Sequence, residues 1–115
     1  NIGGDADNDT INGNAGNDEI LGGTGSDILT GDAGNDRIFG EDDNDGIYGG
    51  GGDDFIDGGV GDDILIGDGG NDTILGGAGN DKLYGGTFND RLDSAAVNDF
   101  VYCVACEDVV FYRVC

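Results

Sequence analysis

The stretch Gly76-Gly77-Ala78-Gly79-Asn80-Asp81-Lys82-Leu83-Tyr84 shows most clearly the unit from which this chain is built. Nine-residue units of this kind follow one another ten times from Gly4 to Asp93, with no insertion or deletion. Each unit has Gly at its first position, Asp at its sixth and Ile or Leu at its eighth. Three fixed positions in ten consecutive copies are not a chance arrangement, so this periodicity decides how the chain is interpreted.

Two sets of residues recur in every unit. The sixth-position acids are Asp9, Asp18, Asp27, Asp36, Asp45, Asp54, Asp63, Asp72, Asp81 and Asp90. The eighth-position aliphatic residues are Ile11, Ile20, Leu29, Ile38, Ile47, Ile56, Leu65, Ile74, Leu83 and Leu92.

The unit resembles the repeats-in-toxin (RTX) nonapeptide, Gly-Gly-x-Gly-x-Asp-x-U-x with U a large aliphatic residue, which is a calcium-binding repeat of parallel β-helices. The resemblance covers 90 of the 115 residues. It implies an all-β fold, a right-handed parallel β-roll in which two units make one 18-residue turn. The ten units then give about five turns, stacked at the interstrand spacing of about 4.8 Å.

Composition supports a fold that needs more than apolar burial. The chain has 26 Gly and only five Phe in 115 residues, too few large side chains for an ordinary core. It carries 25 acidic and four basic residues, a formal net charge of -21, and folding would crowd those carboxylates together. A multivalent cation would reverse that repulsion. The four basic residues are scattered, so neither nucleic acid nor insertion into a membrane is expected.

The two halves of each unit suit different local structures. The first six residues, rich in Gly and ending in Asn-Asp or Asp-Asp, suit a tight turn because these residues tolerate positive φ. The last three suit a short strand, in which the eighth side chain points to one face and its neighbours to the other. One inward aliphatic side chain per unit would build a thin core.

In the roll that the resemblance implies, successive units alternate between two faces. Asp9, Asp27, Asp45, Asp63 and Asp81 then form one column, and Asp18, Asp36, Asp54, Asp72 and Asp90 form the other. Calcium accepts 6–8 oxygens, including carboxylates and backbone carbonyls. Four gaps between turns in each column predict roughly eight calcium ions, whose binding would be coupled to folding. Replacing Asp54 would strip a ligand from two gaps, and replacing Asp90 from one.

Other metal sites and catalysis fit the sequence poorly. An EF-hand beginning at Asp5 would need Gly at Thr10 and Glu at Gly16. Zinc and iron are disfavoured because the chain has no His and its three Cys lie at the far end. Without His, or a Ser or Cys beside a plausible base, the chain is not expected to be an enzyme.

Two departures from the repeat leave alternatives open. Asp43 stands at a fourth position, where Gly is usual, and it indicates either a site with extra carboxylates or a strained, weaker one. Outward apolar residues gather on both faces, with Tyr48, Ile66 and Tyr84 near Ile28 and Ile64 on one, and Leu21, Phe39, Phe55 and Leu75 on the other. They predict either lateral packing against another chain or glycan, or isolated exposed side chains of no consequence.

The two ends differ from the interior. Asn1-Ile2-Gly3 fits the last part of a preceding unit, so the roll begins mid-repeat with an open edge. Residues 1–93 are predicted to form the RTX β-roll, and 94–115 a C-terminal capping or assembly β-hairpin with strands at 100–105 and 109–114. Cys103, Cys106 and Cys115 are an odd set, which leaves Cys115 as a candidate for an intermolecular disulfide.

Two functions are consistent with this sequence. The first is an extracellular calcium-binding structural or assembly protein that stacks end to end, and possibly laterally, into a fibre. The second, implied by the resemblance, is a C-terminal calcium-dependent folding and type I secretion module of a larger secreted protease, lipase, toxin or adhesin. Both place the chain outside a bacterial cell. The sequence has no secretory signal, no apolar span of ~20 residues and no initiator Met, so a processed product or a fragment is expected.

Overall fold

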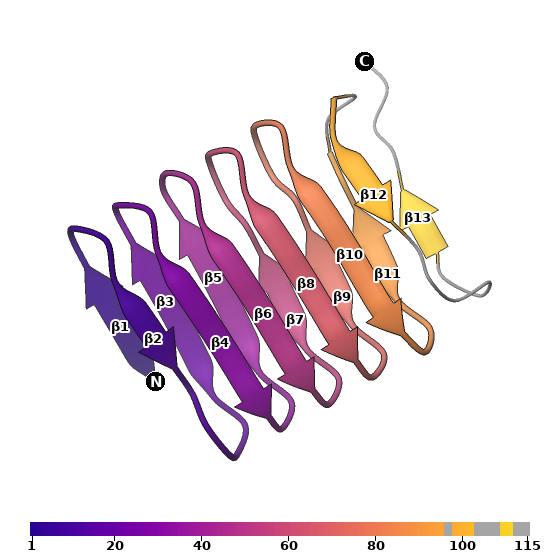
Figure 1. Ribbon diagram of the computed structural model, residues 1–115, viewed down its shortest axis with the longest axis horizontal. Helices are drawn as coiled ribbons and strands as arrows, with labels where there is room; N and C mark the ends of the chain where they lie inside the picture. Colours follow the sequence, from indigo (N-terminus) through magenta and orange to yellow (C-terminus); the bar gives the residue numbers. More distant parts are fainter. Residues whose placement is uncertain (96–97, 103–108, 112–115) are drawn as a thin grey trace.

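The computed structural model describes residues 1–95, 98–102 and 109–111, with side chains as far as residue 102 (Figure 1). Each nonapeptide contributes one short strand, and no helix occurs among the described residues. This part of the chain therefore holds no helix long and apolar enough to cross a membrane. The strands are β1 (Ile2–Asp5), β2 (Thr10–Asn12), β3 (Glu19–Gly23), β4 (Ile28–Ala33), β5 (Arg37–Glu41), β6 (Gly46–Gly51), β7 (Phe55–Asp57), β8 (Ile64–Gly69), β9 (Thr73–Leu75), β10 (Lys82–Thr87), β11 (Arg91–Asp93), β12 (Phe100–Tyr102) and β13 (Val109–Phe111).

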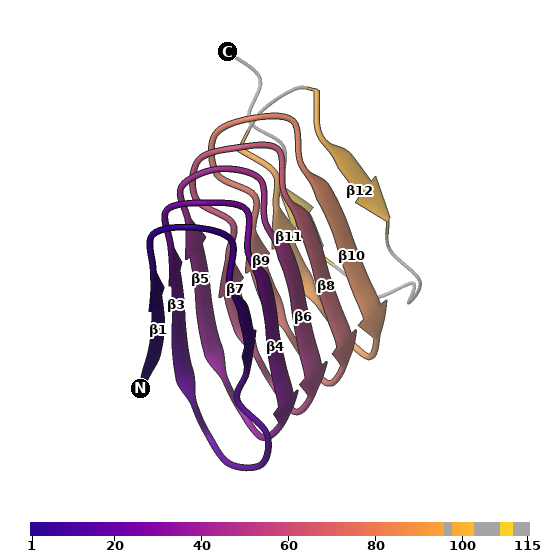
Figure 2. The same ribbon diagram turned by 60° about the vertical axis from the view of Figure 1, so that its left-hand side comes forward.

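The strands form two parallel sheets that face each other (Figure 2). One sheet has the order β1-β3-β5-β7-β9-β11-β13, and the other has the order β12-β10-β8-β6-β4-β2. Every strand pair joins positions that lie two nonapeptide units apart, as in Ile20 opposite Ile38 and Ile47 opposite Leu65. The chain therefore alternates between the sheets and advances by one strand spacing per turn. The predicted parallel β-roll is confirmed, with about 6 turns rather than five.

The core is a single column of aliphatic side chains between the sheets. All ten eighth-position residues are buried, and nine of them have no exposed surface. Alternation along each strand places the seventh and ninth residues on the outside, which gives burial patterns such as exposed-buried-intermediate for Arg91–Asp93. Ile2 and Val101 pack against the two ends of the column. The prediction of one inward aliphatic residue per unit is correct.

The C-terminal strands do not form the predicted β-hairpin. β12 pairs in parallel with β10, and β13 pairs in parallel with β11, so the two strands lie in different sheets. Strands of a hairpin and strands of a roll have the same alternating sequence pattern, so the pattern cannot distinguish them. In the roll, the backbone groups along one edge of β10 and of β11 can pair with the next strands. Val101 and Val110 stand opposite Leu83 and Leu92, two units earlier in the chain, which is the spacing of the roll. A separate capping or assembly role for 94–115 stays a prediction.

The outward apolar residues lie on the two outer faces as predicted. Tyr48, Ile66 and Tyr84 are neighbours on consecutive strands of the six-stranded sheet. The Tyr84 ring lies 6.1 Å from the Phe100 ring and 6.1 Å from the Tyr102 ring, between centroids. On the seven-stranded sheet the Phe39 and Phe55 rings lie 5.8 Å apart, and the Arg37 guanidinium covers both.

Candidate metal centres between the turns

Different positions of the unit use glycine for different reasons. The second and fourth positions adopt positive φ through most of the roll, as at Gly50 (φ 101°) and Gly52 (φ 115°). Non-glycine residues at these positions adopt it too, including Asp43 with φ 76°. The first-position glycines are not among the positive-φ residues. Their invariance therefore needs another explanation, which the aspartate columns provide.

The sixth-position aspartates form the two predicted columns, one along each edge of the roll. In each column the backbone N–H of one Asp donates to Oδ1 of the Asp 18 residues later, at 2.7–2.9 Å. A second ladder runs beside it in the opposite direction. There the N–H of a fifth-position residue donates to Oδ1 of the fifth-position Asn or Asp of the preceding turn, as from Asn35 to Asn17 at 2.8 Å. The fifth-position residues therefore join adjacent turns by hydrogen bonds, a role that the sequence analysis did not predict.

From Asp27 onward, each column Asp uses only one of its two carboxylate oxygens, Oδ1, in this ladder. The second oxygen, Oδ2, is buried and has no hydrogen-bond partner at eight interior positions. These positions are Asp18, Asp27, Asp36, Asp45, Asp54, Asp63, Asp72 and Asp81. From Asp27 onward the column residues are only 1–3 % exposed. A buried carboxylate oxygen without a donor is strongly unfavourable, so each one requires a proton or a cation.

A backbone oxygen approaches each of these carboxylate oxygens. At Gly22, the point where a Cβ would stand lies 2.6 Å from Oδ2 of Asp27 and 2.6 Å from the carbonyl oxygen of Gly40, in the next turn. The same two oxygens converge at nine first-position glycines, always within 3.0 Å of that point. These glycines are Gly4, Gly13, Gly22, Gly31, Gly40, Gly49, Gly58, Gly67 and Gly76. The first position is glycine because a side chain would fill the space between the two oxygens.

The electrostatics of the columns follow from burial. Burial raises the pKa of Asp63 and Asp72 to about 7 from the ordinary value of 3.8, and that of Asp45, Asp54 and Asp81 to about 6. The hydrogen bond from the backbone of the preceding turn lowers these pKa values, but the charges of neighbouring carboxylates raise them again. Without a cation, these five carboxyl groups therefore lose their charge more readily near neutral pH than an exposed Asp does.

The donor set fits calcium. Carboxylate and carbonyl oxygens are the ligands of a hard cation. The two oxygens that converge at each first-position glycine are of this kind, and neither is the nitrogen or sulfur ligand that zinc prefers. The described residues contain no cluster of three or more His, Cys, Asp or Glu side chains. Each gap between turns therefore offers two aspartates at most, and backbone carbonyls would have to complete the coordination. When bound there, calcium would supply the positive charge that the buried oxygens lack.

The ends of the columns differ from the interior. Asp9 is half-buried, and its Oδ2 accepts a hydrogen bond from the N–H of Asp5 at 3.3 Å. Asp90 does not lie in the last turn, because β13 adds a further strand beyond β11. The column that begins at Asp9 continues past Asp81 to Asp99, whose Oδ1 accepts from the N–H of Asp81 at 2.7 Å. Sequence reasoning missed Asp99, although it follows Asp81 by two units, like every other pair in the column.

Asp43 takes the strained conformation that the sequence suggested and also makes a contact. Its φ of 76° lies in the left-handed region. Its Oδ2 accepts a hydrogen bond from the N–H of Gly25, in the preceding turn, at 3.0 Å. The extra carboxylate of Asp43 therefore binds the loop of the preceding turn. Whether it makes a metal site with extra carboxylates or a strained, weaker one stays a prediction.

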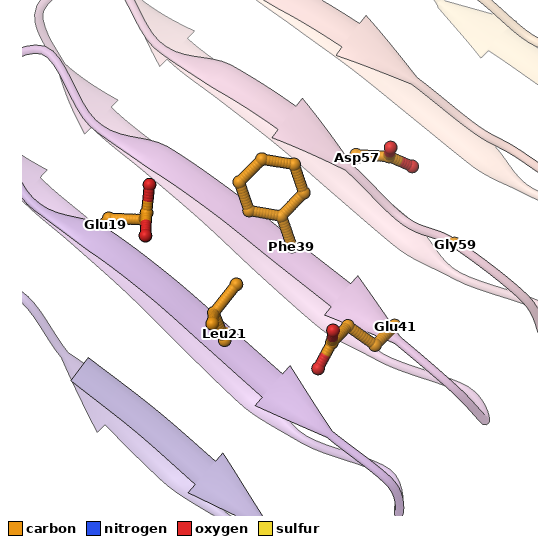
Figure 3. Close-up of a pocket in the computed structure, with 6 residues that line it drawn as sticks. All are labelled: Glu19, Leu21, Phe39, Glu41, Asp57 and Gly59. Atoms are coloured by element: carbon orange, nitrogen blue, oxygen red, sulfur yellow. The ribbon is translucent and has the colours of Figure 1, made fainter. Parts of the chain in front are cut away.

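A shallow groove of about 210 Å³ lies on the outer face of the seven-stranded sheet, away from the columns. Figure 3 shows the Phe39 ring between Leu21 on β3 and Asp57 on β7. Glu19 and Glu41 lie along the same groove, and Arg37 lies 3.9 Å from Glu19. The groove lacks the convergent buried polar groups of a catalytic site.

Comparisons with known proteins agree with this geometry. The family model described as RTX calcium-binding nonapeptide repeat matches the chain in four copies, at residues 2–29, 21–56, 30–65 and 57–92. No curated protein matches the chain. The β-roll of RTX repeats is a calcium-binding structural motif and not a catalytic fold, and proteins that contain it are typically bacterial and secreted. The repeat, the parallel roll and the match across residues 2–92 show that this chain belongs to the RTX calcium-binding nonapeptide-repeat family.

Proposed function

We propose that the two aspartate columns are the calcium ligands of this chain, and that calcium bound between adjacent turns drives folding of the roll. The proposed ligands are the ten sixth-position residues from Asp9 to Asp90, together with carbonyl oxygens of the loops. The observation that carries this proposal is the row of buried Oδ2 atoms without hydrogen-bond partners. Roughly eight ions would bring about +16 against the formal charge of -21.

The ligand assignment can be tested with three Asp→Asn variants, each of which removes one charge. Asp54 lies between two partners, because it accepts from Asp36 and donates to Asp72. Asp9 has only Asp27 as a partner within its column. Asp57 lies on the outer face of β7 and serves as the matched control.

We expect Asp54→Asn to lower calcium affinity most, Asp9→Asn less and Asp57→Asn hardly at all. Isothermal titration with calcium chloride, followed by far-ultraviolet circular dichroism, measures both binding and folding. Equal losses in the three variants would contradict the column assignment, because they would reflect net charge alone.

We further propose an extracellular structural role in which copies of the roll associate. Among the described residues, β1 and β2 each pair on one side only, so the backbone groups on their other side can pair with a further strand. The seventh and ninth positions of the six-stranded sheet carry one charged residue, Lys82, in a chain of net charge -21. The exposed Asp32 and Asp68 lie near the ends of β4 and β8, so a second copy that packs on the seventh and ninth positions alone would avoid most of the carboxylates of this chain.

The alternative is a calcium-dependent folding and type I secretion module of a larger secreted protein. The secreted, bacterial character of RTX proteins favours it. The same open first turn supports it too, because an upstream segment could continue the roll.

Sedimentation velocity and electron microscopy of the purified chain, in millimolar calcium and after chelation, separate the two functions. Calcium-dependent filaments or oligomers support the structural role, and a monomer under every condition supports the folding module. Repeating the measurement with a thiol reductant tests the predicted disulfide of Cys115, a residue that lies outside the described part of the chain.

A further inference from the structure

The RTX match ends at residue 92, but the roll does not. β12 adds to the six-stranded sheet beyond β10, with Leu83 opposite Val101 and Tyr84 opposite Tyr102. This is the register of every earlier pair in that sheet. The described residues among 94–102 therefore fit an eleventh unit, with Ser94 at the first position, Asp99 at the sixth and Val101 at the eighth.

The loop of this unit begins like the others despite lacking glycine. Ala95, at its second position, has a φ of 65°, close to the 69° of Asn14 at the corresponding position. The N–H of Ala95 donates to Oδ1 of Asp93 at 3.1 Å, just as the N–H of Asn14 donates to Oδ1 of Asn12 at 2.9 Å. An alanine in the left-handed region is strained, so the surrounding roll imposes this conformation.

The oxygen arrangement of the interior is also reproduced. Asp81 is 1 % exposed, and its Oδ2 has no hydrogen-bond partner. The point where a Cβ on Gly76 would stand lies 2.8 Å from that oxygen and 3.0 Å from the carbonyl oxygen of Ser94. The Oδ1 of Asp99 accepts from the N–H of Asp81, which completes the pair. A buried oxygen in need of positive charge therefore lies between the last matched unit of this column and a unit outside the match.

We propose that Asp81, Asp99 and the carbonyl oxygen of Ser94 form a further calcium site, beyond the recognised repeats. The inference rests on the proposed function, because it extends the same column by one gap. It raises the number of hydrogen-bonded aspartate pairs from eight, four in each column, to nine. Strain at Ala95 should weaken this site, as strain at Glu41 and Asp43 should weaken others of the same column.

Asp99→Asn tests the site, with Asp57→Asn as the charge-matched control. Equilibrium dialysis in calcium chloride, followed by metal analysis, gives the number of ions per chain, and far-ultraviolet circular dichroism checks the fold. The wild type and Asp57→Asn should bind the same number of ions, and Asp99→Asn should bind one fewer. An unchanged number in Asp99→Asn overturns the inference, whereas a wild type that binds no calcium overturns the proposed function itself.

Ala95→Gly covers the case in which Asp99→Asn loses more than one ion or fails to fold. Relief of a left-handed alanine is worth roughly 1 kcal/mol, which corresponds to about five-fold in affinity. One ion should therefore bind about five-fold more tightly in Ala95→Gly, with the total number unchanged. The same affinity in both proteins would overturn the inference.

Discussion

The aliphatic column and the aspartate columns are built by the same repeat, yet only the aspartates have buried atoms that need a partner from outside the protein. Both recur with every turn and both are buried, with the aliphatic residues from Ile20 onward at 0 % and the aspartates from Asp27 onward at 1–3 % exposure. The aliphatic side chains find their partners within the column. The aspartates from Asp18 to Asp81 keep a carboxylate oxygen, Oδ2, that has no hydrogen-bond partner among the described protein atoms. The centre of the roll therefore satisfies itself by packing, whereas the buried oxygens at its edges need a proton or a cation.

Removing calcium should have the largest effect, because it acts on every gap between turns at once. We expect a chelator to abolish most of the β-sheet signal in far-ultraviolet circular dichroism at pH 7.5, and excess calcium to restore it. Magnesium at the same concentration is the control, since it demands a stricter geometry and releases its water reluctantly. Full β-structure in the chelated chain would show that the aliphatic column suffices alone.

A core substitution should damage the roll without changing its sites. Ile56→Ala removes a side chain with no exposed surface, and such changes cost about 2–5 kcal/mol of unfolding free energy. Urea unfolding in saturating calcium measures this loss. The number of bound ions at saturation should equal that of the wild type, whereas Asp54→Asn should lower ion binding. If Ile56→Ala also lost ions at saturation, the two kinds of column would not be separable.

The first-position glycines allow a test of the space between the two converging oxygens. Gly40→Ala would place a Cβ between Oδ2 of Asp45 and the carbonyl oxygen of Gly58, and overpacking of this kind costs about 1–3 kcal/mol. Gly51→Ala is the matched control, because its Cβ would meet nothing within 4 Å and its φ is not positive. Calcium titrations of both variants should show weaker binding for Gly40→Ala only. Similar losses would mean that glycine serves backbone flexibility at both positions.

Acid should have the smallest effect and should strengthen the metal-free roll. The folded-state pKa values of about 6 to 7 lie above the ordinary 3.8, so the folded chain binds more protons than the unfolded chain between about pH 4 and pH 7. The stability due to protonation is present at low pH and is lost as the pH rises through 6 to 7. Circular dichroism of the chelated chain should therefore show more β-structure at pH 5 than at pH 8.

Asp63→Asn/Asp72→Asn provides the control for this acid effect. Neutral amides imitate protonated carboxyl groups, so the double variant should depend less on pH than the wild type. Loss of structure on acidification would contradict the assignment of buried, proton-binding carboxyl groups.

Much of the site could be read from the sequence, but its chemistry could not be read in full. The two-unit turn that the RTX resemblance implies predicted which aspartates share a column, and the hydrogen bonds between them agree. The spacing could not show that, from Asp27 to Asp81, a backbone N–H occupies one oxygen of each carboxylate and the other oxygen has no hydrogen-bond partner. Glycine at the first position was read as a turn former, because sequence cannot separate a glycine needed for φ from one needed for space.

The C-terminal part was misread for a related reason. The chain has no glycine from Ser94 onward, so the repeat is not recognisable there. The two apolar stretches that follow it then predict a hairpin. Asn98-Asp99-Phe100-Val101 still fits the fifth to eighth positions of a unit. This further unit could have been found from the two-unit interval, which separates Asp81 from Asp99 and Leu83 from Val101. Stacked turns keep this interval even where the glycines of the repeat are replaced.

The sequence by itself determined the repeat and the inward side of its aliphatic residue, because side chains alternate along a strand, and its resemblance to the RTX nonapeptide predicted the parallel stacking. Only the tertiary structure decided which oxygens are left without donors, why the first position excludes a side chain, and where the roll continues beyond the matched repeat. Those properties arise between residues one full turn apart in the chain, where the register of neighbouring turns places a carboxylate, a carbonyl and the empty space of a glycine at one point.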